Sequence, residues 1–367
     1  MTRDKIRIGV IGVGFGAQVH IPAFKSEGLD VVAVSARRHE RAVEAADQFE
    51  IPHVFTDYRE MLKMDDLDAV SIVSPPSLHH SMALAALESG KHVLCEKPFT
   101  TDKLKALEMW RVARTTGLTA MIAHEFRFAS ARMMVKELID QGYLGPLSMV
   151  LMSLIIGPRR GFQLRPATDR DDASQGGGFL FALGAHYIDC LRHWFGEINS
   201  VSGKVFTHAG ERIDPETEAT INTTADDTFH FWLSFANGGW ASMTGTTAAP
   251  FGNGARVEIF GRDGTLITPH LGQGFNPPAH GTLLGARAGD EGLSPILIPE
   301  RLQTFSDDRD DRLMPFRLLT REFIRGIQEG VSPAPNFYDG YRCQQVLDAI
   351  RESSKTGQVV PVELPDA

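Results

Sequence analysis

Cysteine is scarce in this chain, and its few copies stand far apart. The three residues, Cys95, Cys190 and Cys343, are odd in number and widely separated, which does not fit the disulfide framework of a small secreted domain. No closely spaced set of Cys, His and carboxylate residues has the spacing of a zinc site, and a lone His-x-x-Asp on a helix is too little to hold a metal. We therefore expect reduced thiols, a cytoplasmic location and no bound metal ion.

Long apolar runs and an excess of basic charge are missing as well. The longest apolar runs are far shorter than the ~20 residues that a membrane-spanning helix needs, and the N-terminal residues lead into a strand pattern rather than a signal peptide. The 46 acidic residues outnumber the 37 Lys and Arg residues, for a net charge of −9, whereas nucleic-acid binding needs a basic surface. We therefore expect neither a membrane nor a nucleic acid as a partner.

The first third of the chain alternates short apolar runs with amphipathic stretches, which predicts a doubly wound α/β (Rossmann) domain with a parallel sheet. The apolar, strand-like runs are residues 5–12, 30–36, 68–74, 92–96 and 119–124. The amphipathic, helix-like stretches are residues 39–49, 79–90 and 102–117. The last two end in Gly90 and Gly117, which are typical helix stops.

After about residue 130 the alternation stops and an α+β pattern begins. A helix over 131–142 and a long strand over 147–156 precede a glycine-led helix over 179–195. Strand patterns then follow one another without helices between them, and "ANGG" at 236–239 has the composition of a hairpin turn. We expect a mostly antiparallel sheet in an α+β domain.

The length of 367 residues is more than one average core needs, so we expect two domains. They are residues 1–125 and residues 126–367, with C-terminal helices over 314–330 and 338–357 that are able to pack back on the first domain. The stretch 268–315 is rich in Gly, Pro and charge, and it is either a functional loop or simply a mobile one.

A glycine-rich turn follows the first predicted strand and opens a helix. The letters "GVGFGA" place Gly12, Gly14 and Ala17 in a Gly-x-Gly-x-x-Ala pattern that includes Phe15 and Gly16. Gly12 permits the tight turn, Gly14 lets the backbone approach a diphosphate, and Ala17 lets helix and strand pack closely. The N–H groups at the start of the helix then bind phosphate oxygens. In a βαβ series this pattern predicts a nicotinamide dinucleotide site.

The end of the second predicted strand bears on the type of cofactor. NAD sites usually place Asp or Glu there to hold the ribose 2′-hydroxyl, but this chain has Ser35, Arg37 and Arg38, with no carboxylate before Glu40. A guanidinium group can bind a 2′-phosphate bidentately. We therefore favour NADP(H), with NAD(H) as the alternative if the two arginines are only solvated residues at a helix start.

Two segments at the ends of later strands carry further candidates, because open α/β sheets bind ligands at the carboxyl edge. The candidates in "SPPSLHH" and "CEKPFT" are Ser74, Pro75, His79, Glu96 and Lys97. Pro98 restricts Lys97 to an extended conformation, which can aim the ammonium group across a cleft. The alternative is an ordinary surface lysine in a loop.

The whole chain resembles the glucose–fructose oxidoreductase / inositol dehydrogenase / MocA (Gfo/Idh/MocA) family. The resemblance rests on the glycine-rich turn and on "SPPSLHHSMALAALESGKHVLCEKPFT", "GGGFLFALGAHYID" and "APNFYDG", with Glu-Lys-Pro as its most specific part. It implies a Rossmann domain over 1–125 and a substrate and oligomerisation domain over 126–367 with an open-faced antiparallel sheet. Through this sheet two or four copies of the chain are expected to form a homodimer or homotetramer. It also implies nicotinamide-dependent oxidation or reduction of a sugar, polyol or related hydroxy compound.

The same resemblance assigns positions in the site. Lys97 matches the active-site lysine of the family, and His186 matches its catalytic histidine. The glycine-rich turn matches the phosphate loop. The segment that lines the nicotinamide is matched by Ser74, Pro75 and His79.

The chemistry of the pair can be stated from the residues. Oxidation of a secondary alcohol needs a group that takes the hydroxyl proton, which an imidazole such as that of His186 can do near neutral pH, while Lys97 stabilises negative charge on the oxygen. Asp189 lies on the same helix face as His186 and can fix the imidazole tautomer. The alternatives are a satisfied core histidine and a helix-surface carboxylate.

Three features depart from the family pattern. Ala182 stands where many sugar dehydrogenases of the family have Asp, Glu125 in "AHEFRF" stands where Asn is usual, and the acid after the second strand is missing. We expect Glu125 and Arg127 to contact substrate. The polar contact missing at Ala182 must come from Asp189, Glu125, substrate or water.

The substrate is the least determined feature. Arg159, Arg160 and Arg165 can suit an anionic substrate or can simply face solvent, and the 268–315 stretch is a further candidate for specificity. Two other functions remain open. One is a redox-cycling, glycoside-cleaving enzyme that retains its cofactor, and the other is a non-enzymatic nucleotide-binding regulator, which Ala182 favours but the presence of Lys97 and His186 does not.

Overall fold

The computed structural model describes residues 5–268, 281–303 and 305–364. The chain divides into two compact units, of which the first comprises residues 1–125 and 307–344 and the second comprises residues 126–306 and 345–367. The C-terminal helices are thus shared between the units. Within the described ranges, no helix has both the length and the apolar character needed to cross a membrane.

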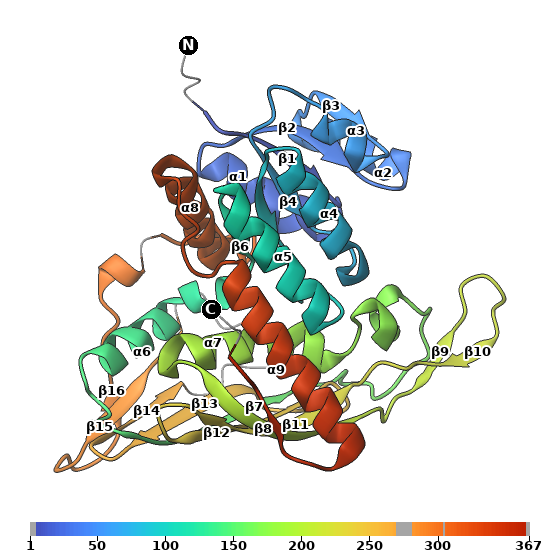
Figure 1. Ribbon diagram of the computed structural model, residues 1–367. Coiled ribbons are helices and arrows are strands. Elements are labelled where there is room, and N and C mark those ends of the chain that lie inside the picture. The colour runs from blue at the N-terminus through green and yellow to red at the C-terminus, as the bar shows by residue number, and fades with distance from the viewer. Residues whose placement is uncertain (1–4, 269–280, 304, 365–367) are drawn as a thin grey trace. The chain divides into compact units, whose positions relative to one another are not determined.

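A six-stranded parallel sheet in the order β3-β2-β1-β4-β5-β6 forms the centre of the first unit (Figure 1). Its strands are β1 (Arg7–Ile11), β2 (Asp30–Ser35), β3 (His53–Phe55), β4 (Ala69–Ile72), β5 (His92–Cys95) and β6 (Ala120–Ile122). The predicted doubly wound sheet is confirmed. The strand order reverses between β1 and β4, which opens the crevice where such sheets bind nucleotides.

The helices of the first unit follow the predicted pattern closely. They are α1 (Ile21–Ser26), α2 (His39–Phe49), α3 (Tyr58–Leu62), α4 (Pro76–Glu88), α5 (Lys103–Thr116) and α8 (Leu313–Glu329), and α9 (Phe337–Thr356) begins here and continues into the second unit. Local chemistry sets the ends of α5. The Asp102 side chain accepts the backbone N–H groups of Leu104 and Lys105, and Gly117 ends the helix at a φ of 68°.

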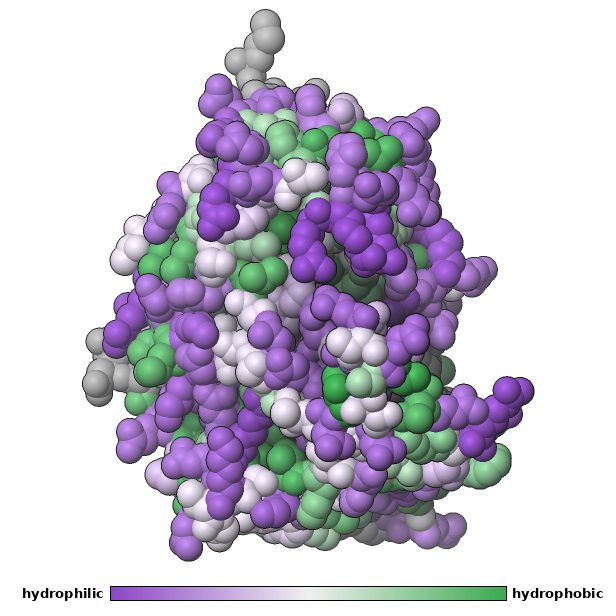
Figure 2. Space-filling view, turned by 90° about the vertical axis from the view of Figure 1, so that its right-hand side faces the viewer, coloured by the Kyte–Doolittle hydropathy of each residue, from purple (hydrophilic) through white to green (hydrophobic). Residues whose placement is uncertain are grey.

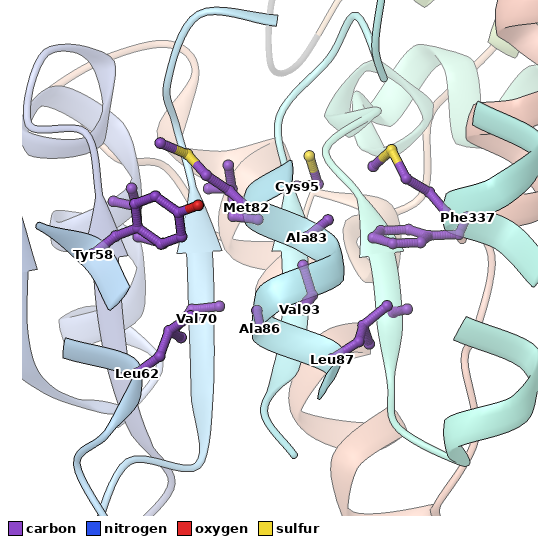
Figure 3. Packing of buried hydrophobic residues seen from close by; sticks show 14 of the residues in the cluster. Tyr58, Leu62, Val70, Met82, Ala83, Ala86, Leu87, Val93, Cys95 and Phe337 are labelled. Carbon is purple, nitrogen blue, oxygen red and sulfur yellow. The ribbon is translucent and has the colours of Figure 1, made fainter. Parts of the chain in front are cut away.

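Small residues on α4 let that helix pack closely on the sheet. Ala83 and Leu87 of α4 lie against Val70 of β4 and Val93 and Cys95 of β5 in one buried apolar cluster (Figure 3). Interiors of this density do not tolerate changes of volume easily. This packing therefore restrains β4 and β5, whose carboxyl ends carry candidate residues.

A nine-stranded sheet in the order β16-β15-β14-β13-β7-β12-β11-β8-β17 forms the second unit. Its strands are β7 (Leu147–Ile155), β8 (Ile198–Phe206), β11 (Thr228–Phe235), β12 (Trp240–Thr246), β13 (Gly254–Gly261), β14 (Gly264–Thr268), β15 (Leu284–Arg287), β16 (Ser294–Pro295) and β17 (Val360–Pro361). Among the described strand pairings of this nine-stranded sheet, only that of β7 with β12 is parallel. A separate pair consists of β9 (Glu211–Ile213) and β10 (Thr220–Asn222).

The two faces of this sheet differ in burial, because the side chains on one face lie in the core of the unit and those on the other face are more exposed. In β11 the side chains of Phe229, Phe231 and Leu233 are buried while His230 between them is exposed, as a half-buried strand requires. Helices α6 (Ser130–Asp140) and α7 (Ala185–Phe195) lie over one face of the sheet (Figure 1). The predicted, mostly antiparallel sheet and the hairpin turn at 236–239 are confirmed.

The 268–315 stretch is not a continuous loop. Residues 269–280 lie outside the described residues, so the part of the prediction that falls on them is not addressed by the structure. Beyond them, β15 and β16 extend the sheet edge by antiparallel pairing. The interpretation as a loop is therefore wrong for these strands, which are too short to produce a sequence pattern.

Hydrophilic side chains cover most of the molecular face drawn in Figure 2, and hydrophobic residues appear there as separate groups. The largest buried side chains, such as Phe24, Phe181 and Phe316, are withdrawn from solvent instead.

Candidate functional site

The glycine-rich turn connects β1 to the crevice at the point where the strand order reverses. Gly12 has a φ of 104°, and a Cβ there would lie 2.3 Å from the carbonyl oxygen of Val73. Its N–H donates to the Ser35 carbonyl at 2.8 Å. Among the residues that the structure describes, a Cβ on Gly14 would meet nothing within 4 Å, so the turn leaves open space there where a diphosphate would lie against the backbone. The turn fits the dinucleotide site that the sequence predicts.

Gly16, directly before Ala17, packs closely on β1. Gly16 is buried, and a Cβ there would stand 3.0 Å from Val10 Cγ1, whereas Ala17 is half-buried. Gly16–His20 form a wide π-type turn before α1. A side chain at position 16 would therefore crowd β1, and the close packing expected of Ala17 stays a prediction.

The end of β2 places the proposed 2′-phosphate ligands in accessible positions. Ser35 is buried at the strand end, and Arg37 and Arg38 are both exposed where α2 begins. Ser35 supplies its carbonyl to Gly12. The two arginines are consistent with the predicted role and with solvated helix-start residues alike.

Lys97 follows β5 and is the partly exposed residue of a buried segment. Every residue from Val93 to Thr100 except Lys97 is buried. The Glu96 side chain turns inward, where its Oε2 accepts the backbone N–H of Lys97 at 3.1 Å and its Oε1 lies 3.0 Å from His20 Nε2. Lys97 therefore stands on a backbone that its neighbours fix from inside.

The electrostatics of Glu96 follow from these contacts. Burial disfavours its charged form, but the hydrogen bond and charge of His20, together with the charge of Lys97, outweigh burial and hold the pKa of Glu96 below its usual value. Glu96 is therefore a carboxylate at neutral pH. It provides negative charge directly under the lysine segment.

His79 lies inside the protein, between the ends of the two loops. Its side chain is completely buried, with Nε2 at 2.8 Å from the Ser74 carbonyl and Nδ1 at 3.1 Å from the Pro98 carbonyl. Burial lowers the pKa of His79, against smaller opposing effects of these carbonyls and of Glu96. A neutral imidazole has a single N–H and donates to one of the two carbonyls, and the predicted contact of His79 with the cofactor stays a prediction.

Glu125 follows β6, on the neighbouring strand end, and is 3% exposed. Burial and the charge of Glu96 raise the pKa of Glu125 to about 8, against the opposing charges of Lys97 and Arg312. Two neighbouring carboxyl groups are thus held in different protonation states, which is an arrangement typical of acid–base sites. Glu125 carries a proton at neutral pH.

Replacing Glu125 with Gln is expected to stabilise the protein at alkaline pH. Because the folded-state pKa lies above the unfolded one, the wild type loses stability as pH rises from about 4.5 to about 8, and Gln removes this loss. We expect a gain of about 1–3 kcal/mol at pH 8 in urea unfolding and almost none at pH 5. Glu137→Gln, which alters an exposed pair with Arg301, is the control; equal effects of E125Q at both pH values would contradict the assignment.

His186 stands in the first turn of α7, in the second unit. The predicted helix over 179–195 is divided, because Leu180–Gly184 form a wide π-type turn and α7 begins at Ala185. His186 is 2% exposed, and its ring stacks on Phe126 at a centroid distance of 3.8 Å and an interplanar angle of 7°. This contact fixes the plane of the imidazole.

Asp189 is committed to an arginine. Its side chain is completely buried, and its two oxygens accept Arg127 Nε and Nη2, each at 2.6 Å. The alternative of a helix-surface carboxylate is therefore wrong. Arg127 is 5% exposed and forms this bidentate ion pair, and its predicted contact with substrate stays a prediction. The pair fixes the short turn Glu125–Phe128 against α7 and so supports Phe126 and His186.

The arginines proposed for an anionic substrate divide into two groups. Arg159 and Arg160 are exposed. Arg165 binds both oxygens of Asp171, at 2.8 and 2.7 Å, and Arg212 binds the same carboxylate. Burial opposes the charge of Asp171, but the hydrogen bonds of Arg165, Thr168 and Arg212 lower its pKa to about 2. Arg165 is therefore engaged within the loop.

Two residues near the lysine segment were not predicted. His20 contacts Glu96 as described, and Arg312 stacks its guanidinium 5.0 Å from the ring centre of Phe15 in the glycine-rich turn. Arg312 also binds Asp310 through Nε and Nη2. The only sequence signal for His20 is its place directly after the glycine-rich turn, and Arg312 lies in a charged run that resembles a solvated loop.

Comparison with known proteins follows the same division into two parts. Residues 6–124 match the model of the Gfo/Idh/MocA oxidoreductase family with an NAD-binding Rossmann fold, and residues 136–364 match that family's C-terminal alpha/beta domain. An uncharacterized oxidoreductase, sll0816, from Synechocystis is 30% identical over 99% of this chain and 98% of its own length.

Two further matches extend over nearly the full length. Levoglucosan dehydrogenase from Pseudarthrobacter phenanthrenivorans is 27% identical over 96% of each chain. A solved structure of levoglucosan dehydrogenase in complex with NADH and levoglucosan is 25% identical, with a TM-score of 0.86 over 98% of this chain and all of the other. With the glycine-rich turn and the Lys97 segment in place, the chain belongs to the Gfo/Idh/MocA oxidoreductase family and is a nicotinamide-dependent dehydrogenase or reductase.

Proposed function

We propose that this chain transfers hydride between NADP(H) and a secondary alcohol or carbonyl group of a sugar, polyol or related compound. The observation that carries the proposal is the placement of Lys97, which is the partly exposed residue of an otherwise buried segment at the carboxyl edge of the parallel sheet. The similarity to a protein named levoglucosan dehydrogenase, and to its complex with NADH and levoglucosan, supports a sugar-like substrate.

The first unit supplies the binding groups for the cofactor. Gly12 and Gly14 form the turn for the diphosphate, and Arg37 and Arg38 are available to a 2′-phosphate. When bound, the nicotinamide accepts hydride from an alcohol or donates it to a carbonyl group.

The protein's own residues handle the proton. In the oxidative direction we assign His186 as the base that takes the hydroxyl proton on an imidazole nitrogen, and Lys97 as the cation that hydrogen-bonds the same oxygen. In reduction His186 returns the proton to the oxygen. Asp189 acts on this chemistry through the position of Arg127 and the Phe126–His186 stack, not by contact with substrate.

Glu125 is a second group able to hold a proton beside Lys97. It is buried and protonated at neutral pH, so its O–H can donate where the family usually offers an Asn amide. We propose that it contacts the substrate or the lysine and supplies the polar contact that Ala182 cannot.

Replacing Arg37 and Arg38 together with Ala is expected to weaken NADP+ binding by about tenfold to a hundredfold, which corresponds to the loss of one hydrogen bond to a charged group, about 1.5–3 kcal/mol. NAD+ binding should hardly change. Arg41→Ala, at another exposed position on α2, is the matched control. Quenching of intrinsic fluorescence measures the dissociation constants, and tighter binding of NAD+ than NADP+ by the wild type would refute the NADP(H) preference.

We further propose that the protein works in the cytoplasm as a homodimer or homotetramer assembled through the sheet of the second unit. The three buried cysteine thiols suit a reducing compartment. Light scattering coupled to gel filtration tests the assembly, and a monomer at micromolar concentration would contradict it.

A panel assay tests the proposed reaction. Purified protein is mixed with NADP+ or NAD+ and single sugars, polyols and glycosides, and the near-ultraviolet absorbance of the reduced cofactor is followed. Net reduction with at least one free sugar or polyol supports the dehydrogenase. Cleavage of a glycoside without net reduction, by protein that retains its cofactor through purification, would support the glycoside-cleaving alternative instead.

A further inference from the structure

A completely buried histidine lies beneath the lysine segment and has no part in the proposed chemistry. His20 closes the wide turn Gly16–His20 that follows the glycine-rich turn, and its exposed fraction is 0%. The rings of Phe15, Phe24 and Phe316 surround it at centroid distances of 5.6, 5.8 and 4.2 Å. Such a ring is held in one orientation by its packing.

The hydrogen bonds of His20 connect two segments of the first unit. Glu96 is a carboxylate and can only accept, so His20 Nε2–H donates to Glu96 Oε1 at 3.0 Å. On the other side of the ring, His20 Nδ1 is hydrogen-bonded to the Ser71 hydroxyl at 2.7 Å. The other oxygen of Glu96 accepts the backbone N–H of Lys97 at 3.1 Å. This chain of hydrogen bonds therefore runs from β4 through the glycine-turn helix to the peptide that carries Lys97.

The free-energy cost of burying these polar groups indicates that they fix the position of neighbouring segments rather than stabilise the fold. A buried carboxylate and its partner lose hydration that their attraction only partly returns, and apolar residues of similar size are often equally or more stabilising. The surrounding phenylalanines show that an apolar filling suits this place. The polar chain is instead the direct physical link between the turn and the lysine segment.

We propose that His20 is a positioning residue for Lys97, which acts through the Glu96 carboxylate to hold the lysine segment in register with the phosphate-binding turn. On the other side of the segment, His79 Nδ1 lies 3.1 Å from the Pro98 carbonyl, so a buried histidine adjoins the peptide on each side of Lys97. The inference rests on the proposed role of Lys97 in the reaction.

Two substitutions of His20 separate position from packing. His20→Gln places an amide N–H₂ near the Nε2 position and retains the donor to Glu96, whereas His20→Asn places its amide near Nδ1 and retains only the contact with Ser71. Both are polar and smaller than His, so they disturb the phenylalanine packing to a similar degree. A melting temperature for each variant shows whether both remain folded.

The expected result is a split between the two variants. H20N should lower kcat by about tenfold to a hundredfold, the loss that a small misplacement of a reacting group causes, with the dissociation constant of the cofactor within about threefold of wild type. H20Q should keep kcat within about threefold. Equal kcat losses in both variants, or a loss in neither, would overturn the proposal.

A double variant tests whether the effect passes through the lysine. In a Lys97→Met background, H20N should cause almost no further loss in the residual rate, because the group that it positions is absent. A full additional loss would overturn the proposal. If H20N does not fold, Glu96→Leu replaces it in the same cycle, since Leu can accept from neither His20 nor Lys97.

The baseline separates this inference from the proposed function. Absence of wild-type turnover on the whole panel would refute the proposed function itself. Wild-type turnover that depends on Lys97 but is indifferent to H20N would refute only the role of His20.

Discussion

The Lys97→Met variant is expected to lose about 10²–10³-fold in kcat while binding the cofactor nearly as tightly as the wild type. The segment around Lys97 is fixed by Glu96 from inside and lies against His79 at Pro98, so an apolar side chain of similar length should leave its backbone in place. What disappears is a cation that stabilises charge on the substrate oxygen, and loss of one such donor typically has an effect of this size. Steady-state rates and a cofactor titration measure the two quantities separately.

The control for this variant is Lys103→Met, at an exposed position at the start of α5. It removes the same charge from the same unit and should leave kcat within about twofold of wild type. A Lys97→Met enzyme with unchanged kcat would remove Lys97 from the mechanism. A large loss of cofactor binding with little change in kcat would assign Lys97 to cofactor binding alone.

The His186→Asn variant should lose about 10²–10⁴-fold in kcat for alcohol oxidation, which is the usual contribution of a general base. Asn has no nitrogen that can take a proton, so the part of the pH dependence that belongs to the general base should be lost in the variant. The pH dependence of kcat/KM is the measurement that distinguishes proton transfer from a packing role beside Phe126.

An exposed histidine in the same unit provides the control. His230→Asn changes an exposed side chain of β11 that contacts Thr244 and should keep both the rate and its pH dependence. Because His186 is buried against Phe126, melting temperatures must accompany the kinetics. An H186N enzyme that is folded and keeps the wild-type pH profile would identify His186 as a core histidine.

The fold could be predicted because long elements repeat strong patterns. The continuous apolar runs of β1, β2, β4 and β5 and the amphipathic stretches of α2 and α5 state their type directly. Three-residue strands such as β3 and β6 give a weaker pattern or none, and β15 and β16 fell in a stretch interpreted as a loop. The division of the C-terminal region between two units depends on long-range packing that no local pattern contains.

The residues of the candidate site could be predicted from motifs and from their position after strands, but the side chains that contact them could not. Lys97 and the glycine turn are marked by neighbours in the sequence, whereas Asp189 meets Arg127 across 62 residues and Glu96 meets His20 across 76. These pairings hold Arg127 and Asp189 together in the second unit and Glu96 and His20 together in the first. The wide turn over Gly16–His20 could not be predicted either, because the sequence does not distinguish a π-type turn from an ordinary helix start.

Hydride transfer to the cofactor is the central claim, and isotope transfer tests it most directly. The wild type is incubated with NADP+ and a mixture of carbon-deuterated sugars and polyols, and the recovered cofactor is analysed by mass spectrometry. This readout registers transfer even when the product does not accumulate. We predict deuterium in the reduced cofactor from the wild type and a much slower appearance with Lys97→Met; a cofactor that stays unlabelled after prolonged incubation would contradict the account.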